Sequence, residues 1–158
     1  MSCKRKAALT KKMDVNTCNI DLLSIREESD PVDIYAEAQR LSDLINDLPG
    51  SPCGTLKAHM IRRNMTVEKL SMESGVSEAT IKRLRNDINY TPIKTKALAI
   101  CLGLKLEPPL QKDWLRKLGI VLSSTPQDLM YELLMSKYYK APISIINDML
   151  WGCGCQPL

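Results

Sequence analysis

Residues 65–87 read Met-Thr-Val-Glu-Lys-Leu-Ser-Met-Glu-Ser-Gly-Val-Ser-Glu-Ala-Thr-Ile-Lys-Arg-Leu-Arg-Asn-Asp. This stretch predicts two short helices joined by a tight turn. Thr66 and Ser77 stand where a hydroxyl can accept a backbone hydrogen bond and so cap the start of each helix. Gly75 stands at the turn, where the chain needs a positive φ angle that glycine adopts without steric cost.

The apolar residues of this stretch fall where the two predicted helices touch each other. On the first helix the contact residues are Leu70 and Ser71. On the second they are Ile81 and Leu84, and Val76 fills the space below the turn. The remaining face of the second helix carries cationic and small polar side chains. This pattern is typical of a helix-turn-helix, whose second helix enters the major groove of DNA.

The side chains on that outward face, with the two helix caps, are the candidate DNA contacts. They are Thr66, Ser77, Glu78, Ala79, Thr80, Lys82, Arg83 and Arg85. Glu78 can accept a hydrogen bond from cytosine N4, Arg83 can fork onto guanine, and the small side chains at 79 and 80 can touch a thymine methyl group. Lys82 and Arg85 are expected at phosphates. The two caps have a structural role whatever the function is.

Residues 54–104 resemble the Cro/lambda-repressor type helix-turn-helix domain, also called the XRE family. The matching residues are Leu56, Ile61, Met65, Thr66, Leu70, the run 74–77, the run 80–84, Asn86, Asp87, Pro92, Leu98, Ala99 and the run 102–104. The resemblance implies a lambda-repressor-like fold of five helices that binds double-stranded DNA. It also implies a homodimer on two half-sites about one helical turn apart. We therefore expect a bacterial transcriptional regulator.

Two positions depart from the family's pattern. Many relatives have a DNA-contacting Gln where this chain has Val67, and Gln or Arg where it has Glu78. Both departures favour an alternative function, a protein-interaction module that retains the fold and regulates a toxin or a peptidase. The charge of residues 51–86 opposes that alternative, because seven Lys and Arg against three Glu leave a net +4 beside the motif.

The rest of the chain also reads as helical, so the predicted fold class is all-α. Residues 1–30 are expected to form a flexible arm, residues 31–48 an amphipathic helix, and residues 105–158 a C-terminal helical module. This last part looks like the helical tail of some bacterial regulator-like proteins. The helix at 31–48 either packs within the chain or pairs with a second copy, and either it or the tail is expected to supply a dimer interface.

Four finer expectations concern helices around the motif. A helix from Thr55 should place Leu56, Met60 and Ile61 on one face. The sequence Thr91-Pro92 should open another helix, and Gly103 should stop it. The chain's two tryptophans, Trp114 and Trp151, occur at apolar helical spacing and are predicted to pack in the interior.

Composition excludes several other classes of protein. No apolar run is long enough to cross a membrane, and the basic segment 1–12 is not followed by the apolar stretch of a secretory signal. We therefore expect a cytoplasmic protein with reduced thiols. A single histidine, His59, argues against a catalytic nucleophile with a histidine base, and it leaves the pair Cys153 and Cys155 short of a metal site. No catalytic residue, cofactor or metal is predicted.

Overall fold

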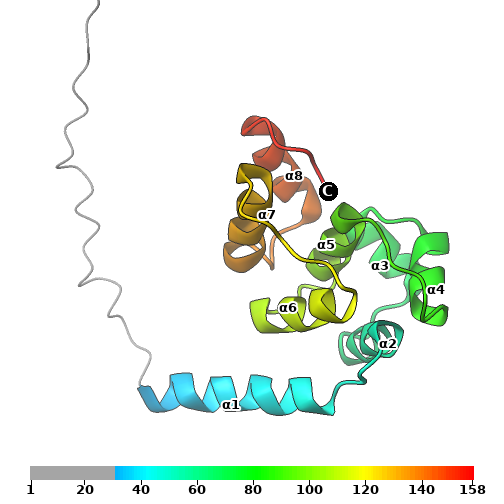
Figure 1. The fold of residues 1–158 in the computed structure, drawn as a ribbon, viewed down its shortest axis with the longest axis vertical. Helices are drawn as coiled ribbons and strands as arrows, with labels where there is room; N and C mark the ends of the chain where they lie inside the picture. The colour runs from blue at the N-terminus through cyan, green and yellow to red at the C-terminus, as the bar shows by residue number, and fades with distance from the viewer. Residues whose placement is uncertain (1–30) are drawn as a thin grey trace, which may run out of the picture. The chain divides into compact units, whose positions relative to one another are not determined.

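The computed structural model describes residues 31–158, a part of the chain that contains eight helices and no strand (Figure 1). The helices are α1 (Pro31–Asp47), α2 (Pro52–Arg62), α3 (Val67–Ser74), α4 (Glu78–Asn86), α5 (Lys94–Gly103), α6 (Pro108–Lys117), α7 (Pro126–Lys137) and α8 (Ile143–Gly152). The all-α prediction is confirmed, and the arm predicted at 1–30 lies outside the described residues. None of these eight helices has the length and apolar character needed to cross a membrane. By its internal contacts the chain divides into two units, 1–37 and 38–158, with the boundary inside α1.

The second half of α1 belongs to the larger unit and packs on its core. Leu41, Leu44 and Ile45 are half-buried against the core residues. Arg40 adds an ion pair, with Nη2 lying 3.3 Å from Oε2 of Glu107. Of the two alternatives for the 31–48 helix, packing within the chain therefore holds for this half.

Helix α2 begins at Pro52, three residues before the expected start at Thr55. Ser51 caps it by accepting a hydrogen bond from the backbone N–H three residues on, at 3.2 Å. Proline suits this position because its missing N–H would have no partner there. The expected apolar face is wrong at Ile61, which is 79% exposed, while Thr55 and His59 are buried. Burial lowers the pKa of His59 to about 4, so its imidazole is neutral at neutral pH.

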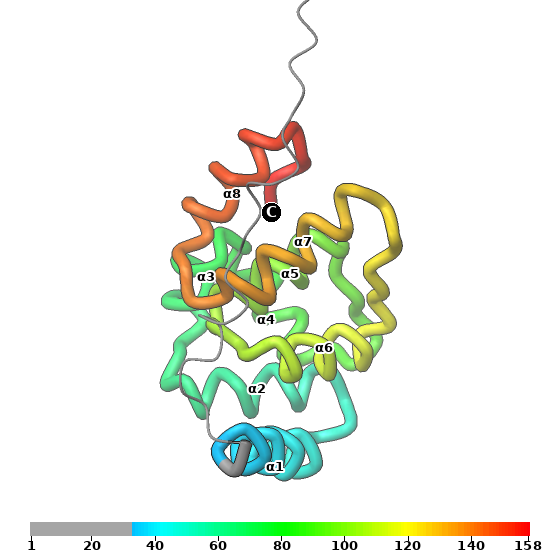
Figure 2. The backbone as a smooth tube through the Cα atoms, turned by 90° about the vertical axis from the view of Figure 1, so that its left-hand side faces the viewer, coloured from blue at the N-terminus to red at the C-terminus, as the bar shows by residue number. Residues whose placement is uncertain are grey.

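Helix α5 forms the centre of the larger unit. Its residues from Ala97 to Gly103 are all buried, and it contacts α3 on one side and α7 and α8 on the other. Figure 1 shows α3 and α4 on one side of α5 and α7 and α8 on the other. Figure 2 shows α6 directly above α2, and these two helices contact each other. Apolar burial around α5 is the main stabilising contribution to the fold.

The structure corrects the expected start of α5 and confirms its expected end at Gly103. The helix begins at Lys94, and Pro92 is a buried residue ahead of it. Gly103 is its last helical residue, whereas the positive φ angle, 51°, belongs to Lys105. Glycine is needed at 103 for another reason: a Cβ there would lie 2.7 Å from Cβ of Ser74 on α3. The glycine thus allows α3 and α5 to approach closely.

The two tryptophans have opposite environments. Trp114 on α6 is 1% exposed, as predicted, and its indole N–H donates to the carbonyl of Pro52 at 3.0 Å. Trp151 is 76% exposed, so the packing prediction is wrong for it. The last turns of α8 bury only the face that carries Ile146 and Leu150, and Trp151 lies on another face of that helix.

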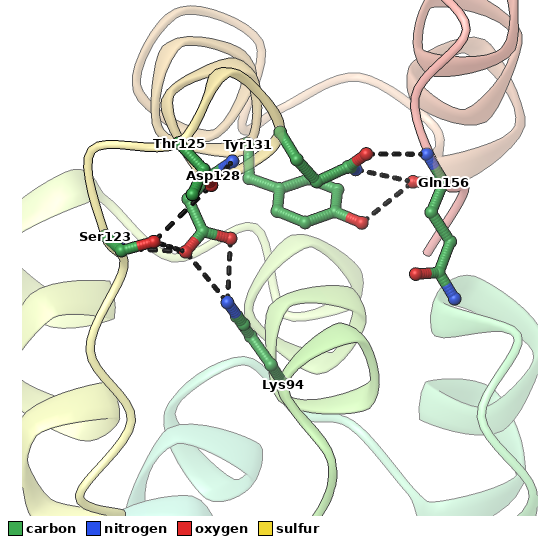
Figure 3. Close-up of polar contacts among 7 residues, drawn as sticks. Lys94, Ser123, Thr125, Asp128, Tyr131 and Gln156 are labelled. Atoms are coloured by element: carbon green, nitrogen blue, oxygen red, sulfur yellow. Dashed lines mark hydrogen bonds and ion pairs between the residues drawn. The ribbon is translucent and has the colours of Figure 1, made fainter.

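A buried carboxylate joins α5 to α7 (Figure 3). Lys94 donates through Nζ to both carboxylate oxygens of Asp128, at 2.7 and 2.8 Å. Ser123 donates to Oδ2 from its backbone N–H at 2.8 Å and from its hydroxyl at 2.7 Å. Nearby, Tyr131 donates to the carbonyl of Gln156 at 2.8 Å, which fixes the C-terminal segment on α7. The contacts from Lys94 and Ser123 lower the pKa of Asp128 to about 2 from its ordinary 3.8.

Asp128→Asn should therefore destabilise the protein in a way that depends on pH. A carboxylate whose folded pKa is depressed stabilises the fold above its unfolded pKa, and this contribution disappears as pH falls through the folded pKa. The gap in free energy of unfolding between wild type and variant should be constant above about pH 4 and narrow towards about pH 2. Urea denaturation at a series of pH values measures it. A gap that stays constant down to pH 2 would contradict the ion pair.

Candidate nucleic-acid interface

Helix α3 begins and ends at the residues that the sequence pattern indicated. The Thr66 hydroxyl oxygen accepts a hydrogen bond from the backbone N–H of Lys69 at 3.2 Å. Gly75 has a φ angle of 68° and donates its N–H to the carbonyl of Ser71 at 2.9 Å. Ser74 is buried beside the turn, where its hydroxyl donates to the carbonyl of Leu70 at 2.6 Å. The turn is thus fixed by local hydrogen bonds and by one glycine in the left-handed region.

Helix α4 starts at once after the turn and packs its inward face on α3. The Ser77 hydroxyl oxygen accepts from the backbone N–H of Thr80 at 3.4 Å, and the two hydroxyls lie 3.0 Å apart. Four of the five side chains predicted to hold the two helices together are buried, namely Leu70, Val76, Ile81 and Leu84. The fifth, Ser71, is half-buried. The predicted fold of the motif is confirmed, and α4 has a fixed orientation.

The candidate residues on α4 lie on its outward side, with different degrees of exposure. Ala79, Lys82 and Arg83 are exposed, and so are the two caps Thr66 and Ser77. The other candidates are half-buried, namely Glu78, Thr80 and Arg85. Val67 is a core residue at 5% exposure. Where many relatives have a Gln that contacts DNA, this chain therefore has a side chain that packs in the core.

Three of the charged candidates have partners within the chain. Glu78 and Lys82 form an ion pair one helical turn apart, with Oε2 and Nζ 2.9 Å apart. Arg83 lies over the ring of Tyr90, its Cζ 4.2 Å from the ring centroid, and its Nε is 3.7 Å from Oδ2 of Asp87. The stacking restricts the rotamers of Arg83.

The start of α3 lies within electrostatic reach of this face. The pKa of Glu68 is lowered first by a hydrogen bond from its own backbone N–H and by one from Thr66, and further by Lys82 and Arg85. Glu68 on α3 therefore shares one electrostatic environment with Lys82 and Arg85 on α4. A polyanion that contacts the start of α3 would also be attracted by the positive charges of α4.

A hollow opens where α2, the start of α3 and the end of α4 meet. Its volume is about 550 Å³. It is lined by Lys57, Met60, Ile61, Asn64, Met65, Thr66, Arg85 and Asn86. Two cations, two amides and a hydroxyl are present in this lining, and no carboxylate is. The lining is therefore mixed, with cationic and hydrogen-bond-donating groups beside three apolar side chains.

Comparison with protein families agrees with this geometry. Residues 55–108 match the model of a family described as the Cro/C1-type HTH DNA-binding domain. Residues 55–108 form a Cro/C1-type helix-turn-helix domain. The match runs from the first turn of α2 to the first residue of α6 and includes the whole of α3, α4 and α5. Comparison with curated proteins and with solved structures gave no match.

The Cro/C1-type domain contains three polar residues that sequence reasoning did not place at the site. Lys57, Asn64 and Asn86 line the hollow beside the candidates Thr66 and Arg85. Asn64 has a φ angle of 49° at the end of α2, a conformation that asparagine tolerates better than most residues. An asparagine close to the end of a helix is the signal in the sequence for this conformation. Lys57 on α2 and Asn86 on α4 come together at the hollow because α2 packs on α4.

The described residues provide no cluster suited to a metal. Within residues 31–158, no group of three or more His, Cys, Asp or Glu side chains is close enough to hold an ion. The four cysteines of this range are free thiols, and they are Cys53, Cys101, Cys153 and Cys155. Burial raises the pKa of the Cys101 thiol, so Cys101 is an unreactive packing residue of α5.

Proposed function

We propose that the Cro/C1-type domain recognises a specific double-stranded DNA sequence with α4 in the major groove, and that the protein is a transcriptional regulator. The observation that carries the proposal is the two-sided character of α4. Its inward face is buried on α3, and its outward face presents Ala79, Lys82 and Arg83 to solvent. A capped helix fixed in this way projects the first turns of its outward face into a groove.

The outward face offers both kinds of DNA contact. Arg83 is the candidate for guanine, since a guanidinium can donate two parallel hydrogen bonds to O6 and N7. Ala79 and the methyl group of Thr80 suit a thymine methyl, because the Thr80 hydroxyl already bonds to Ser77. Glu78 can accept from cytosine N4, with Lys82 beside it reducing the cost of a carboxylate near phosphates.

The hollow between α2 and α4 supplies the sequence-independent contacts in this proposal. Arg85 and Thr66 are joined there by Lys57, Asn64 and Asn86. Donors of this kind hold the DNA backbone and so set the register of α4 in the groove. Replacing them should weaken binding to all sequences alike.

Two copies are expected to act together. A helix-turn-helix dimer places two recognition helices in successive major grooves, about 34–36 Å apart. The arrangement doubles the number of base contacts, and it predicts a site with two-fold symmetry. We therefore propose that the active form is a homodimer.

Arg83→Ala should weaken binding to a selected site by about 1–3 kcal/mol and relax its specificity at one base pair. Arg83→Lys should recover little, because an ammonium group cannot fork onto guanine. Fluorescence anisotropy on the site enriched from a random duplex pool measures the loss. Lys140→Ala, a cation on the loop before α8, is the control and should bind as wild type does. Equal losses for all three variants would contradict base reading by Arg83.

The alternative is a helix-turn-helix that binds a protein partner, and the Glu78–Lys82 ion pair is the observation in its favour. The pair neutralises one of the exposed charges of α4. If the domain binds a protein partner in place of DNA, it should not bind the random duplex pool at low salt. Sequence enrichment from that pool therefore distinguishes the two functions.

A further inference from the structure

Helix α7 exposes apolar side chains on the face opposite the core. Tyr131, Leu134 and Met135 point inward and are buried. Leu129 and Leu133, one turn apart, remain 45% and 53% exposed. Adjacent apolar residues on the solvent side of a helix mark a contact surface more often than isolated ones do.

Leu133 forms a ridge between two hollows. On the side of α6 lies a hollow of about 540 Å³, with Leu115, Ile120 and Leu122 in its lining. On the side of α8 lies another of about 380 Å³, with Met130 and Met149 in its lining. Leu133 lines both. This α7 surface therefore has a projecting row of side chains with a groove on each side.

We propose that the α7 surface is where two copies of this chain meet, with the two α7 helices antiparallel across a two-fold axis. A two-fold interface must be complementary to itself. A two-fold axis across antiparallel helices sets Leu129 and Leu133 of one copy against the same two leucines of the other, and these side chains can pack alternately along the ridge. The inference rests on the proposed function, in which a dimer spans two half-sites. Figure 1 shows α5 between α7 and α4, so this contact leaves α4 open to DNA.

The charges on this surface fit a second copy of the same chain. Lys112 and Glu132 lie on the α6 flank of the ridge, with Nζ and Oε1 3.9 Å apart and side chains 75% and 51% exposed. A two-fold axis that pairs antiparallel helices brings each flank against the same flank of the other copy. Glu132 then faces Lys112 of the second copy, and the same pair forms twice.

Sedimentation equilibrium of the full chain at increasing concentration tests the surface. Wild type should associate to a dimer, whereas Leu133→Glu should remain monomeric because it places a carboxylate at the centre of the interface. Met72→Glu is the matched control, since Met72 is an exposed apolar side chain on α3, and it should dimerise as wild type does. Circular dichroism would verify that each variant is folded. A monomeric wild type, or a dimeric Leu133→Glu, would overturn the proposal.

A mixing experiment separates the contact between copies from the ion pair within one chain. Lys112→Glu and Glu132→Lys should each dimerise poorly alone, because like charges then meet across the axis. Mixed in equal amounts they should form a one-to-one dimer, since each Glu of one copy then faces a Lys of the other. A mixture that associates no better than its components would overturn the proposal.

Failure of this inference can be told from failure of the proposed function. Anisotropy on mixed-sequence duplex DNA reports binding by the wild-type chain directly. DNA binding by a protein whose association does not depend on Leu133 would overturn the interface alone. Dimerisation through Leu133 without any DNA binding would overturn the function and leave the interface standing.

Discussion

Trp114→Ala should lower the free energy of unfolding by about 3–5 kcal/mol, the range for removing a large buried aromatic side chain. Trp114 is 1% exposed, and its indole N–H donates to the carbonyl of Pro52 at 3.0 Å. The substitution removes the side chain that ties α6 to the first turn of α2. It also leaves the Pro52 carbonyl without this donor, which adds a desolvation cost. Urea denaturation followed by circular dichroism measures the loss.

Trp151→Ala is the matched control for this experiment. Trp151 is 76% exposed, and surface substitutions of this kind usually change stability by about 0.5 kcal/mol or less. The contrast is informative because the same residue type is removed from the same protein. A loss at Trp151 as large as that at Trp114 would contradict the packing described for α6 and α8.

Gly103→Ala should destabilise the protein by about 1–3 kcal/mol, the usual cost of forcing extra volume into a packed contact. The added Cβ would lie 2.7 Å from Cβ of Ser74 and 3.1 Å from its backbone N and Cα. Backbone atoms cannot move aside as the end of a flexible side chain can, so α3 must shift on α5. Since α3 carries α4, the variant should also bind DNA more weakly than its remaining folded fraction predicts. Thermal unfolding and anisotropy on the selected site measure the two effects.

Gly152→Ala provides the opposite expectation at another helical glycine. A Cβ at Gly152 would have no neighbour within 4 Å, and alanine favours the helix by about 0.5–1 kcal/mol over glycine. This variant should be as stable as wild type or slightly more so. If Gly103→Ala were equally harmless, the close approach of α3 and α5 would be wrong.

The sequence predicted the motif well because its signals are local. Capping by Thr66 and Ser77 and the positive φ angle of Gly75 depend on residues within one turn of each other. Gly103 shows where such reasoning ends. The helix ends at Gly103 as expected, yet the requirement for glycine at that position comes from the close approach of Ser74, on another helix. Close approach between distant segments leaves no local pattern.

The outward face of α4 could be predicted for the same reason, since the buried pair Ile81 and Leu84 fixes the opposite face by helical periodicity. The Glu78–Lys82 ion pair has i,i+4 spacing and could also have been predicted. The stacking of Arg83 on Tyr90 could not, because it depends on the path of the loop after α4. The same holds for the hollow between α2 and α4, which forms only when these helices pack together.

DNA binding as a function of salt is the most direct test of the account. We predict that the wild-type chain binds mixed-sequence duplex DNA in an anisotropy titration, and that log K falls linearly with log salt by about 0.9 per phosphate contact. Replacing Lys82 and Arg85 by alanine should make that slope shallower by about two contacts. Absence of binding at low salt, or an affinity unchanged across the salt series, would contradict the assignment of α4 and the hollow to DNA.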